Sequence, residues 1–361
     1  MCCVPKKSQT KLPHLVDESL SPSAAPMNRR DFSRVIVGAG LAALASAPLP
    51  SAVGKPRSTV GLSIGTYGLK DLTTPDALRL IQETGYDGLQ LAVMPGWSTD
   101  SSKLSAEGRR TLRKQIEDHN LALPSMLESI PLRGTADAKE KNLDRLKRAV
   151  ELGNELVPGR PPCLDTILGR KKVEWENAKE AMAEELRTWV PVLEGGKTTL
   201  TFKPHAGDAV QSAERALWLI QAVGSPRIRI VFDYSHFYVE GYPLEQSLRR
   251  LINFSQMIVV KDSEGTSENH TFLLPGDGKT DYLAYFQLLR ELGYSGFVNV
   301  EVSAHVHRKP DYQPVATAKL CYHRLAPLME RGGLVRPVRR ESNDLGLLTL
   351  RRHPLMQRES K

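Results

Sequence analysis

The feature that most constrains this chain is an alternation of short apolar runs with amphipathic stretches, repeated eight times between residues 61 and 329. The apolar runs predict strands at 61–67, 88–93, 121–127, 163–168, 198–203, 228–233, 257–262 and 297–303. The amphipathic stretches predict helices at 73–84, 105–119, 136–152, 173–193, 208–223, 243–251, 280–292 and 314–329. Strands that alternate with helices predict βαβ units and therefore a parallel sheet.

The number of units favours a closed barrel over an open sheet. Eight strand–helix units in residues 58–336 match the size of a (β/α)8 TIM barrel. The competing fold is an open doubly wound sheet, which would carry a glycine-rich phosphate turn after its first strand. The segment Gly65-Thr66-Tyr67-Gly68 does not supply that turn. The sequence therefore predicts a single-domain α/β protein with the (β/α)8 barrel fold.

Charge separates this body from the two ends of the chain. The formal net charge is +8, of which residues 1–57 carry +5 and residues 337–361 carry +3. Residues 58–336 contain 35 basic and 35 acidic side chains. A body without net charge argues against nucleic acid as a partner, because binding the phosphate backbone needs concentrated Lys and Arg. We expect the basic tail 337–361 to lie outside the barrel and to be disordered.

The N-terminal extension 1–57 resembles a bacterial twin-arginine export signal. Arg29 and Arg30 precede Phe32, and an uncharged stretch follows at 35–53. This resemblance implies a periplasmic or otherwise exported protein, with the twin-arginine export machinery as a partner. Glycine and proline inside the stretch predict that no stable membrane-spanning helix forms. An uncleaved signal would leave the protein anchored to the membrane.

Polar side chains gather at the ends of the last four predicted strands, where a barrel of this kind builds its active site. Charged groups beside apolar runs must be paired or bind a ligand, and such clusters mark candidate functional sites. The cluster comprises Lys203, His205, Asp233, His236, Lys261, Asp262 and Glu301.

Several short motifs in this region resemble those of one family. Asp233-Tyr234-Ser235-His236 and Lys261-Asp262 end two strands, Pro275-Gly276-Asp277-Gly278 precedes a helix, and 293–297 leads toward Glu301. Taken in order, with the first strand–helix–strand unit up to residue 91, they resemble the sugar phosphate isomerase/epimerase family of xylose isomerase-like barrels. The resemblance covers about 60–330 and implies the barrel fold.

The resemblance also implies a mechanism, which this chain matches only in part. Epimerases of the family hold one divalent metal with Glu, Asp, His and Glu from strands five to eight, and the two glutamates move the proton. Asp233 and Glu301 match two of these ligands, and His236 matches the histidine that contacts substrate. Lys203 stands where the fifth-strand glutamate would be, and Val259 stands where the seventh-strand histidine would be.

Two interpretations of the site follow. In the first, Asp233 and Glu301 hold a divalent ion (Mn, Mg, Co or Zn) with a histidine as nitrogen ligand, which is His205, His270, or His236 in place of its contact with substrate. In the second, Lys203 acts as a base or stabilises an enolate, or simply pairs with the carboxylates in a charge-balanced pocket that holds no metal. In both, the predicted catalytic residues are Glu301, Lys203 and Asp233, and the predicted substrate-binding residues are His236, His205, Lys261 and His270.

The function predicted first is that of a sugar isomerase or epimerase that abstracts a proton next to the carbonyl of a free or oxidised sugar. A lyase or hydratase of keto-sugars would use the same enolate chemistry. A sugar-binding protein without catalysis is the other alternative, although a pure binder needs no such density of ionisable groups. An abasic-site endonuclease on the same barrel would need a multi-metal cluster and a basic face, which the sequence lacks.

Overall fold

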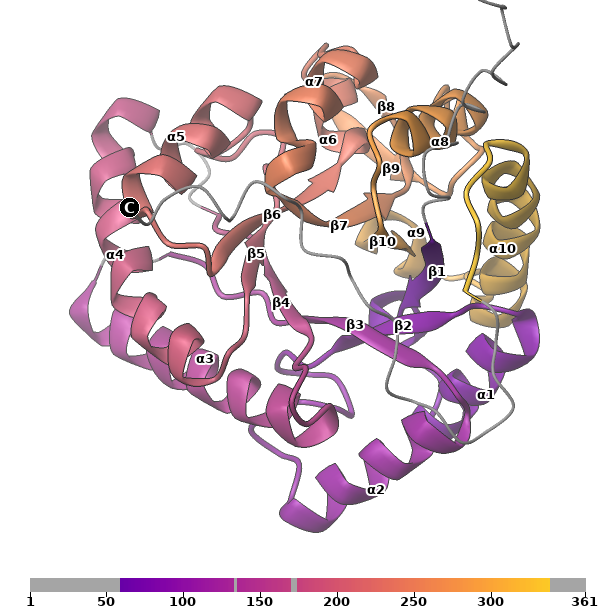
Figure 1. The fold of residues 1–361 in the computed structure, drawn as a ribbon, viewed down its shortest axis with the longest axis horizontal. Coiled ribbons are helices and arrows are strands. Elements are labelled where there is room, and N and C mark those ends of the chain that lie inside the picture. Colours follow the sequence, from indigo (N-terminus) through magenta and orange to yellow (C-terminus); the bar gives the residue numbers. More distant parts are fainter. Residues whose placement is uncertain (1–58, 133–134, 170–173, 338–361) are drawn as a thin grey trace, which may run out of the picture. The chain divides into compact units, whose positions relative to one another are not determined.

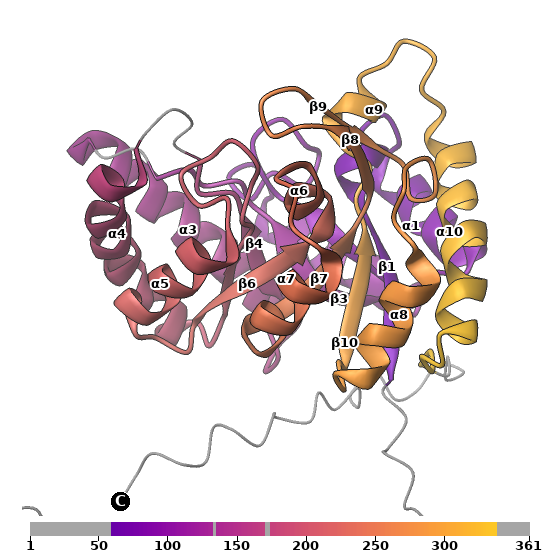
Figure 2. The ribbon, with the colours of Figure 1, turned by 90° about the horizontal axis from the view of Figure 1, so that it is seen from above.

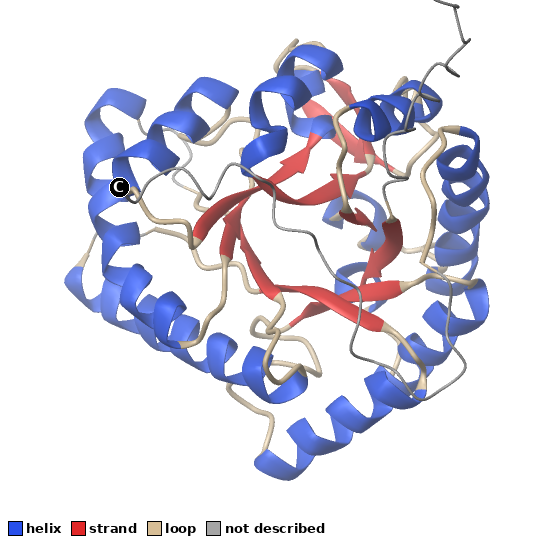
Figure 3. Cartoon of the chain, in the orientation of Figure 1, coloured by secondary structure: helices blue, strands red, loops and turns tan. Residues whose placement is uncertain are grey.

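The structure, a computed structural model, describes residues 59–132, 135–169 and 174–337. Within these residues eight parallel strands close into a barrel in the order β1-β10-β7-β6-β5-β4-β3-β2, and helices surround the strands (Figures 1 and 3). The predicted (β/α)8 barrel is therefore confirmed.

The barrel elements follow the predicted alternation, with shifted ends. The strands are β1 (Val60–Gly65), β2 (Gly88–Ala92), β3 (Ala122–Leu127), β4 (Cys163–Thr166), β5 (Leu200–Phe202), β6 (Ile228–Asp233), β7 (Ser255–Val260) and β10 (Gly296–Val300). The outer helices are α1 (Thr74–Thr84), α2 (Ala106–Asp118), α3 (Ala136–Leu156), α4 (Trp175–Gly195), α5 (Ala213–Val223), α7 (Leu244–Leu251), α8 (Tyr282–Glu291) and α10 (Pro314–Arg331). Short 3-10 turns precede α1 at η1 (Thr66–Leu69) and β7 at η2 (Ile252–Phe254).

Local sequence signals explain where these helices begin and end. The hydroxyl of Thr73 accepts a hydrogen bond from the Asp76 amide and starts α1, and Ser105 starts α2 in the same way. Gly85 ends α1 with a φ of 106°, in the left-handed region that favours glycine. A Cβ at Gly85 would also lie 2.6 Å from the hydroxyl of Tyr322 on α10. This glycine therefore lets α1 end against α10.

Alternation along each strand separates two environments. Leu62 and Ile64 of β1 are fully buried in the apolar core that also contains Leu78 and Ile81 of α1. Ser63, between them, points into the barrel, where its hydroxyl lies 3.0 Å from Oδ1 of Asn299. The outward side of each strand thus packs on helices, while the barrel interior carries polar groups such as Ser63 and Asn299 and a small apolar cluster that includes Val231 and Val259.

The chain closes on itself where β1 begins. The Val60 amide donates to the carbonyl oxygen of Val335 at 2.9 Å. The guanidinium of Arg336 lies 2.8 Å and 2.9 Å from the two carboxylate oxygens of Asp87, and it also donates to the Gly85 carbonyl oxygen. The segment after α10 is therefore fixed to β1 and to the start of β2, at the end of the barrel opposite the carboxyl ends of the strands.

The segments that follow β6, β7 and β10 contain elements that the sequence did not predict. They are α6 (Tyr234–Val239), the antiparallel pair β8 (Asp262–Gly265) with β9 (His270–Leu273), and α9 (Ala304–His307). The hairpin residues are mostly polar, so no apolar periodicity indicates these strands. Gly265, at the end of β8, enters the turn with a φ of 94°. Figure 2 shows β8, β9 and α9 together at the end of the barrel where β10 terminates.

In the part of the chain that the structure describes, no helix is both long enough and apolar enough to span a bilayer. The predicted export segment 1–57 and the basic tail beyond Pro337 lie outside the described residues. Both therefore stay predictions.

Candidate active site at the carboxyl end of the barrel

Two lysines and two carboxylates from four neighbouring strand ends form one hydrogen-bonded cluster. Lys203 follows β5, Asp233 ends β6, Lys261 follows β7 and Glu301 follows β10. The Nζ of Lys203 lies 2.9 Å from Oδ2 of Asp233 and donates to Oε2 of Glu301. The Nζ of Lys261 lies 2.9 Å from Oε1 of Glu301 and donates to Oδ2 of Asp233. The structure thus brings together all three predicted catalytic residues and Lys261.

The cluster is buried, and its charges balance. The side chains of Asp233, Lys261 and Lys203 are 0%, 1% and 6% exposed, whereas that of Glu301 is 15% exposed. Burial alone would raise the pKa of Glu301, but the two ammonium groups outweigh it and hold that pKa below its usual range. They lower the pKa of Asp233 in the same way. Burial would lower the pKa of Lys203, but the carboxylates raise it.

Asp233 is held from both sides of its carboxylate. Its Oδ2 accepts from the two lysines, and its Oδ1 accepts from the Ser235 hydroxyl at 2.6 Å and from the Ser235 amide at 3.2 Å. The second contact makes Asp233 the N-cap of α6, the short helix that carries His236. Asp233 therefore fixes both lysines and the start of α6, while Glu301 is the most exposed member of the cluster.

One residue, Ala206, orients two neutral histidines. Burial, and then the charge of Lys203, lowers the pKa of His205 to about 3. Burial, and then His205 and Lys261, lowers the pKa of His236 well below its usual value. The Nδ1 of His205 lies 3.1 Å from the Ala206 carbonyl oxygen, whereas the Ala206 amide donates to Nδ1 of His236 at 3.2 Å.

The contacts of the two rings differ, and those of His205 assign its tautomer. A carbonyl oxygen only accepts, so His205 carries its proton on Nδ1 and keeps a lone pair on Nε2. An amide only donates, so Nδ1 of His236 accepts from Ala206, and Nε2 of His236 lies 3.4 Å from Nζ of Lys261 and 3.6 Å from Oδ2 of Asp233. The ring centroids are 4.1 Å apart. His205 therefore offers a proton acceptor beside the lysine–carboxylate cluster.

The β8–β9 hairpin covers this side of the cluster with Phe272. The Nζ of Lys261 lies 4.7 Å from the centroid of the Phe272 ring, and the His236 ring lies 4.6 Å from it. The Phe272 amide donates to Nδ1 of His305 at 3.0 Å. Predicted His270 packs on the same phenylalanine at 4.8 Å and bonds the Ser267 carbonyl oxygen. Sequence reasoning missed Phe272, because an isolated aromatic residue in a polar loop gives no signal of its position.

A second group of rings flanks the mouth on the side of β1. Tyr67 stacks on Trp97 at 5.2 Å and meets the edge of His307 at 4.7 Å. Burial, and then the nearby charge of Glu301, raises the pKa of Tyr67. Within the described residues, Nε1 of Trp97 and Nε2 of His307 are buried and have no hydrogen-bond partner. These rings could therefore donate to the hydroxyls of a ligand bound at the mouth.

One layer deeper, a polar belt fills the barrel interior. Its hydrogen bonds run around the barrel through Ser63, Gln90, Ser125, Asp165, Thr201 and Asn299. Burial raises the pKa of Asp165 to about 6. Asn299 and Thr201 precede Glu301 and Lys203 by two residues, so the belt supports the strands that present the cluster.

Glu128, which follows β3, is tethered to a helix. Its Oε1 accepts from Nε of Arg145 on α3 at 2.8 Å. Burial outweighs this arginine and raises the pKa of Glu128 to about 7. Its contacts are therefore those of a structural ion pair at the rim.

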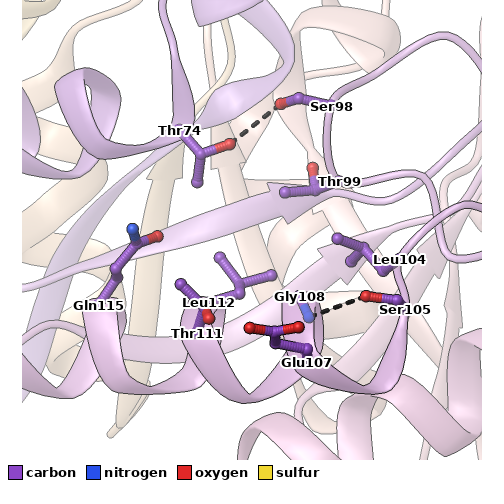
Figure 4. Close-up of a pocket in the computed structure, with 10 residues that line it drawn as sticks. All are labelled: Thr74, Ser98, Thr99, Leu104, Ser105, Glu107, Gly108, Thr111, Leu112 and Gln115. Carbon is purple, nitrogen blue, oxygen red and sulfur yellow. Dashed lines mark hydrogen bonds between the residues drawn. The ribbon is translucent and has the colours of Figure 1, made fainter.

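A hollow of about 320 Å³ lies apart from the cluster, between α1 and α2 (Figure 4). Across it, the hydroxyl oxygens of Thr74 and Ser98 are 3.0 Å apart. Its other polar lining includes Ser105, Glu107, Thr111 and Gln115. It shares no residue with the lysine–carboxylate cluster, so it is not part of the candidate active site.

The sequence and the fold agree with one family. The sequence matches the profile of the xylose isomerase-like TIM barrel family over residues 78–319, more than half of the chain. The chain therefore belongs to this family.

Its curated relatives are named for reactions of inosose or fructoselysine. Inosose isomerase of Bacillus velezensis is 26% identical over 241 residues, which cover 62% of this chain and 81% of that protein. Fructoselysine 3-epimerase of Escherichia coli O157:H7 is 22% identical over 254 residues, covering 68% and 91%. Inosose dehydratase of Geobacillus kaustophilus is 24% identical over 189 residues, covering 47% and 60%. The relatives thus include isomerases, epimerases and dehydratases.

Solved structures share the barrel. The IolI protein with a zinc atom has a TM-score of 0.62 at 17% identity, covering 75% of this chain and 99% of its own. A xylose isomerase-like TIM barrel protein from Mycobacterium smegmatis in complex with magnesium has a TM-score of 0.58 at 16% identity, covering 76% and 98%. At these identities the likeness shows the fold, and the metals are those of the two proteins named.

The residues of this chain's own site do not fit a divalent ion. Among the described residues, no three His, Cys, Asp or Glu side chains are arranged to hold one. Every carboxylate oxygen of Asp233 and Glu301 already accepts from a lysine or from Ser235. An ion bound to both carboxylates would stand roughly 3 Å from an ammonium group, where Coulomb repulsion amounts to about 11 kcal/mol at an effective dielectric of 20.

Proposed function

We propose that this protein is an enzyme that moves a proton next to the carbonyl of a keto-sugar or keto-polyol, with lysine ammonium groups stabilising the enolate. The observation that carries the proposal is the cluster itself: one partly exposed carboxylate, Glu301, held by two buried ammonium groups. The named activities of the family relatives, isomerisation, epimerisation and dehydration, support this class of chemistry.

Lys203 has a donor left for substrate. An ammonium group carries three N–H donors, and Lys203 uses two of them on Asp233 and Glu301. A substrate carbonyl oxygen could accept a hydrogen bond from the third N–H of Lys203. The positive charge of the ammonium group would then lie next to that oxygen as the enolate forms. Removing the α-proton places negative charge on that oxygen, and a cation fixed in a dry site stabilises such charge strongly.

Glu301 is the first proton acceptor. It is ionised at neutral pH, because the two lysines hold its pKa low. As Lys203 turns toward the developing enolate oxygen, Glu301 loses part of that stabilisation, and its basicity rises. Proton removal and enolate stabilisation are coupled through the same ammonium group.

His205 is the second proton carrier. Its Nε2 lone pair is free to accept a proton, because Nδ1 donates to Ala206. His205 follows β5 and Glu301 follows β10, and two strands lie between β5 and β10 in the barrel order. Two proton carriers on different sides of the mouth are what an epimerase needs to remove a proton from one face and return it to the other.

The experiment is deuterium exchange followed by NMR. Full-length protein is incubated in D₂O with inosose, fructose or ribulose, and deuterium incorporated at the carbon next to the carbonyl reports enolate formation, whatever the final product. We expect exchange with at least one probe, and a loss of about 100-fold or more in Glu301→Gln. The exposed His323→Gln on α10 serves as the matched control and should keep full exchange.

Two other outcomes would redirect the assignment. Loss of water from inosose, seen as a new enone absorbance, would favour a dehydratase, the activity named for the Geobacillus relative. Absence of exchange with every probe, together with calorimetric binding of unmodified sugar, would overturn catalysis and leave the sugar-binding alternative.

We also propose that residues 1–57 direct export through the twin-arginine machinery. The support is the sequence alone, in which Arg29 and Arg30 precede an uncharged stretch. Replacing both arginines with lysine should keep the protein in the cytoplasmic fraction of an expressing bacterium. Equal periplasmic amounts of the variant and the parent would contradict the proposal.

A further inference from the structure

Lys203 occupies the place where a metal ion would have to bridge the two carboxylates of the mouth. Its Nζ lies within hydrogen-bonding distance of both Asp233 and Glu301, and its side chain is only 6% exposed. A divalent ion bound to the same pair would need oxygen distances of about 2.0–2.6 Å. The ammonium group and the ion cannot share that space.

Among the residues that the structure describes, no other group of His, Cys, Asp and Glu side chains could hold an ion. Oδ1 of Asp233 accepts from Ser235, and Oε1 of Glu301 accepts from Lys261. The histidine nitrogen near Asp233, Nε2 of His236, lies 3.4 Å from the ammonium nitrogen of Lys261, so it already has a cationic neighbour. The residue paired with Asp233 on β7 is Val259, which is 1% exposed and lies in an apolar cluster inside the barrel.

We infer that Lys203 is a built-in cation that replaces a divalent metal at this mouth, and that two buried residues, Lys203 and Val259, decide between the two kinds of site. The charge count agrees: with Lys203 the four-residue cluster is neutral, and a divalent ion would add two uncompensated charges. With glutamate at position 203 the same cluster would carry a charge of −2, which a divalent ion neutralises.

We expect two substitutions to convert the lysine–carboxylate cluster into a metal site. Lys203→Glu removes the ammonium group and directs a carboxylate toward Asp233 and Glu301. Val259→His adds an imidazole at the β7 position in register with Asp233. Together they would give three carboxylates and one imidazole, a donor set suited to Zn²⁺, Co²⁺ or Mn²⁺. This experiment measures metal binding and not catalysis, so its result does not depend on whether the proposed reaction occurs.

The test measures metal directly in the full chain. Parent protein and the double variant Lys203→Glu/Val259→His are purified, dialysed, titrated with Co²⁺ and followed by visible absorption, with elemental analysis for Mn, Mg, Co and Zn. We expect no stoichiometric metal and no cobalt band in the parent, and one Co²⁺ per chain with a d–d band in the double variant. Lys203→Met/Val259→His is the matched control, which loses the ammonium group without gaining a carboxylate.

Two results would overturn the inference. One is a parent protein that keeps one divalent ion per chain through dialysis and loses it in Asp233→Asn. The other is a double variant that folds, as circular dichroism shows, and still binds no Co²⁺. Should the double variant fail to fold without metal, the parent measurement and recovery of the fold by added Co²⁺ decide the question.

Discussion

Replacing Lys203 with methionine tests whether the cluster is a coupled ion network. Methionine keeps most of the side-chain volume and removes the charge. Lys261 remains bonded to both Asp233 and Glu301, so it compensates one of the two negative charges and leaves one buried charge unpaired. Breaking a buried ion pair on one side costs about 3–5 kcal/mol. Because Lys261 still bonds both carboxylates, we expect Lys203→Met to lower the free energy of unfolding by about 3 kcal/mol at pH 7, the lower end of this range.

The sign of the pH dependence distinguishes this mechanism from lost packing. In the parent, the pKa values of Asp233 and Glu301 lie below their unfolded values of about 3.9 and 4.3. Their stabilisation is therefore complete above those unfolded values and is lost as the pH falls through the folded ones. In Lys203→Met, burial is no longer outweighed at Glu301, so its folded pKa rises above the unfolded value. The variant then gains stability on acidification, and its deficit shrinks between pH 7 and pH 5.

Equilibrium urea unfolding of the parent and of Lys203→Met at pH 7 and pH 5 gives the stability deficit of the variant at each pH. Lys141→Met is the matched control, because Lys141 pairs with Asp137 on the surface of α3, where both side chains are more than 70% exposed. We expect it to change stability by less than about 0.5 kcal/mol at either pH. A Lys203→Met deficit below about 1 kcal/mol, or one that is equal at the two pH values, would refute the coupled network.

Three further predictions concern the scaffold. Arg336→Ala removes the bidentate partner of Asp87 and should lower the free energy of unfolding by about 3 kcal/mol; urea midpoints equal to the parent's would contradict the closure of the chain at β1. Glu128 has a folded pKa of about 7, above its unfolded value of about 4.3, so its contribution to stability falls as the pH rises between these values. Glu128→Gln should therefore make the free energy of unfolding depend less on pH between 5 and 8. An unchanged pH dependence would contradict the raised pKa of Glu128. Gly88→Ala would place a Cβ 2.5 Å from the carbonyl oxygen of Ala122 and should cost about 1–3 kcal/mol in thermal or urea unfolding. Gly195→Ala on α4, where an added Cβ meets nothing within 4 Å, is its control and should show no such cost.

Much of the fold could be predicted because its signals are local. Thr73, Ser105 and Gly85 mark helix ends through hydrogen bonds and backbone angles that depend on a few neighbouring residues. The apolar runs of the strands are continuous because buried parallel strands face helices on one side and the barrel interior on the other. The β8–β9 hairpin could not be predicted in this way, because its polar residues are ordered by contacts made after the barrel has formed, such as Phe272 with Lys261.

The candidate site was predictable as a set of residues but not as an arrangement. The rule that barrel sites form at strand ends was enough to select Lys203, Asp233, Lys261 and Glu301 from the sequence. It could not tell whether Lys203 faces a substrate, a metal or a carboxylate, because these alternatives differ by a few ångströms between strands far apart in the chain. The tautomer of His205 was likewise inaccessible, since it depends on the carbonyl oxygen of Ala206.

The sequence by itself determined the barrel, its order of strands and helices, and the strand ends at which ionisable groups collect, because periodicity and helix caps are properties of neighbouring residues. Only the tertiary structure decided how those groups pair. Lys203 and Glu301 are 98 residues apart in the chain, yet β5, β6, β7 and β10 bring them into one neutral cluster with Asp233 and Lys261. Charges at such separations find partners only when barrel closure sets the distances between them, and this closure is what places a lysine between the two carboxylates.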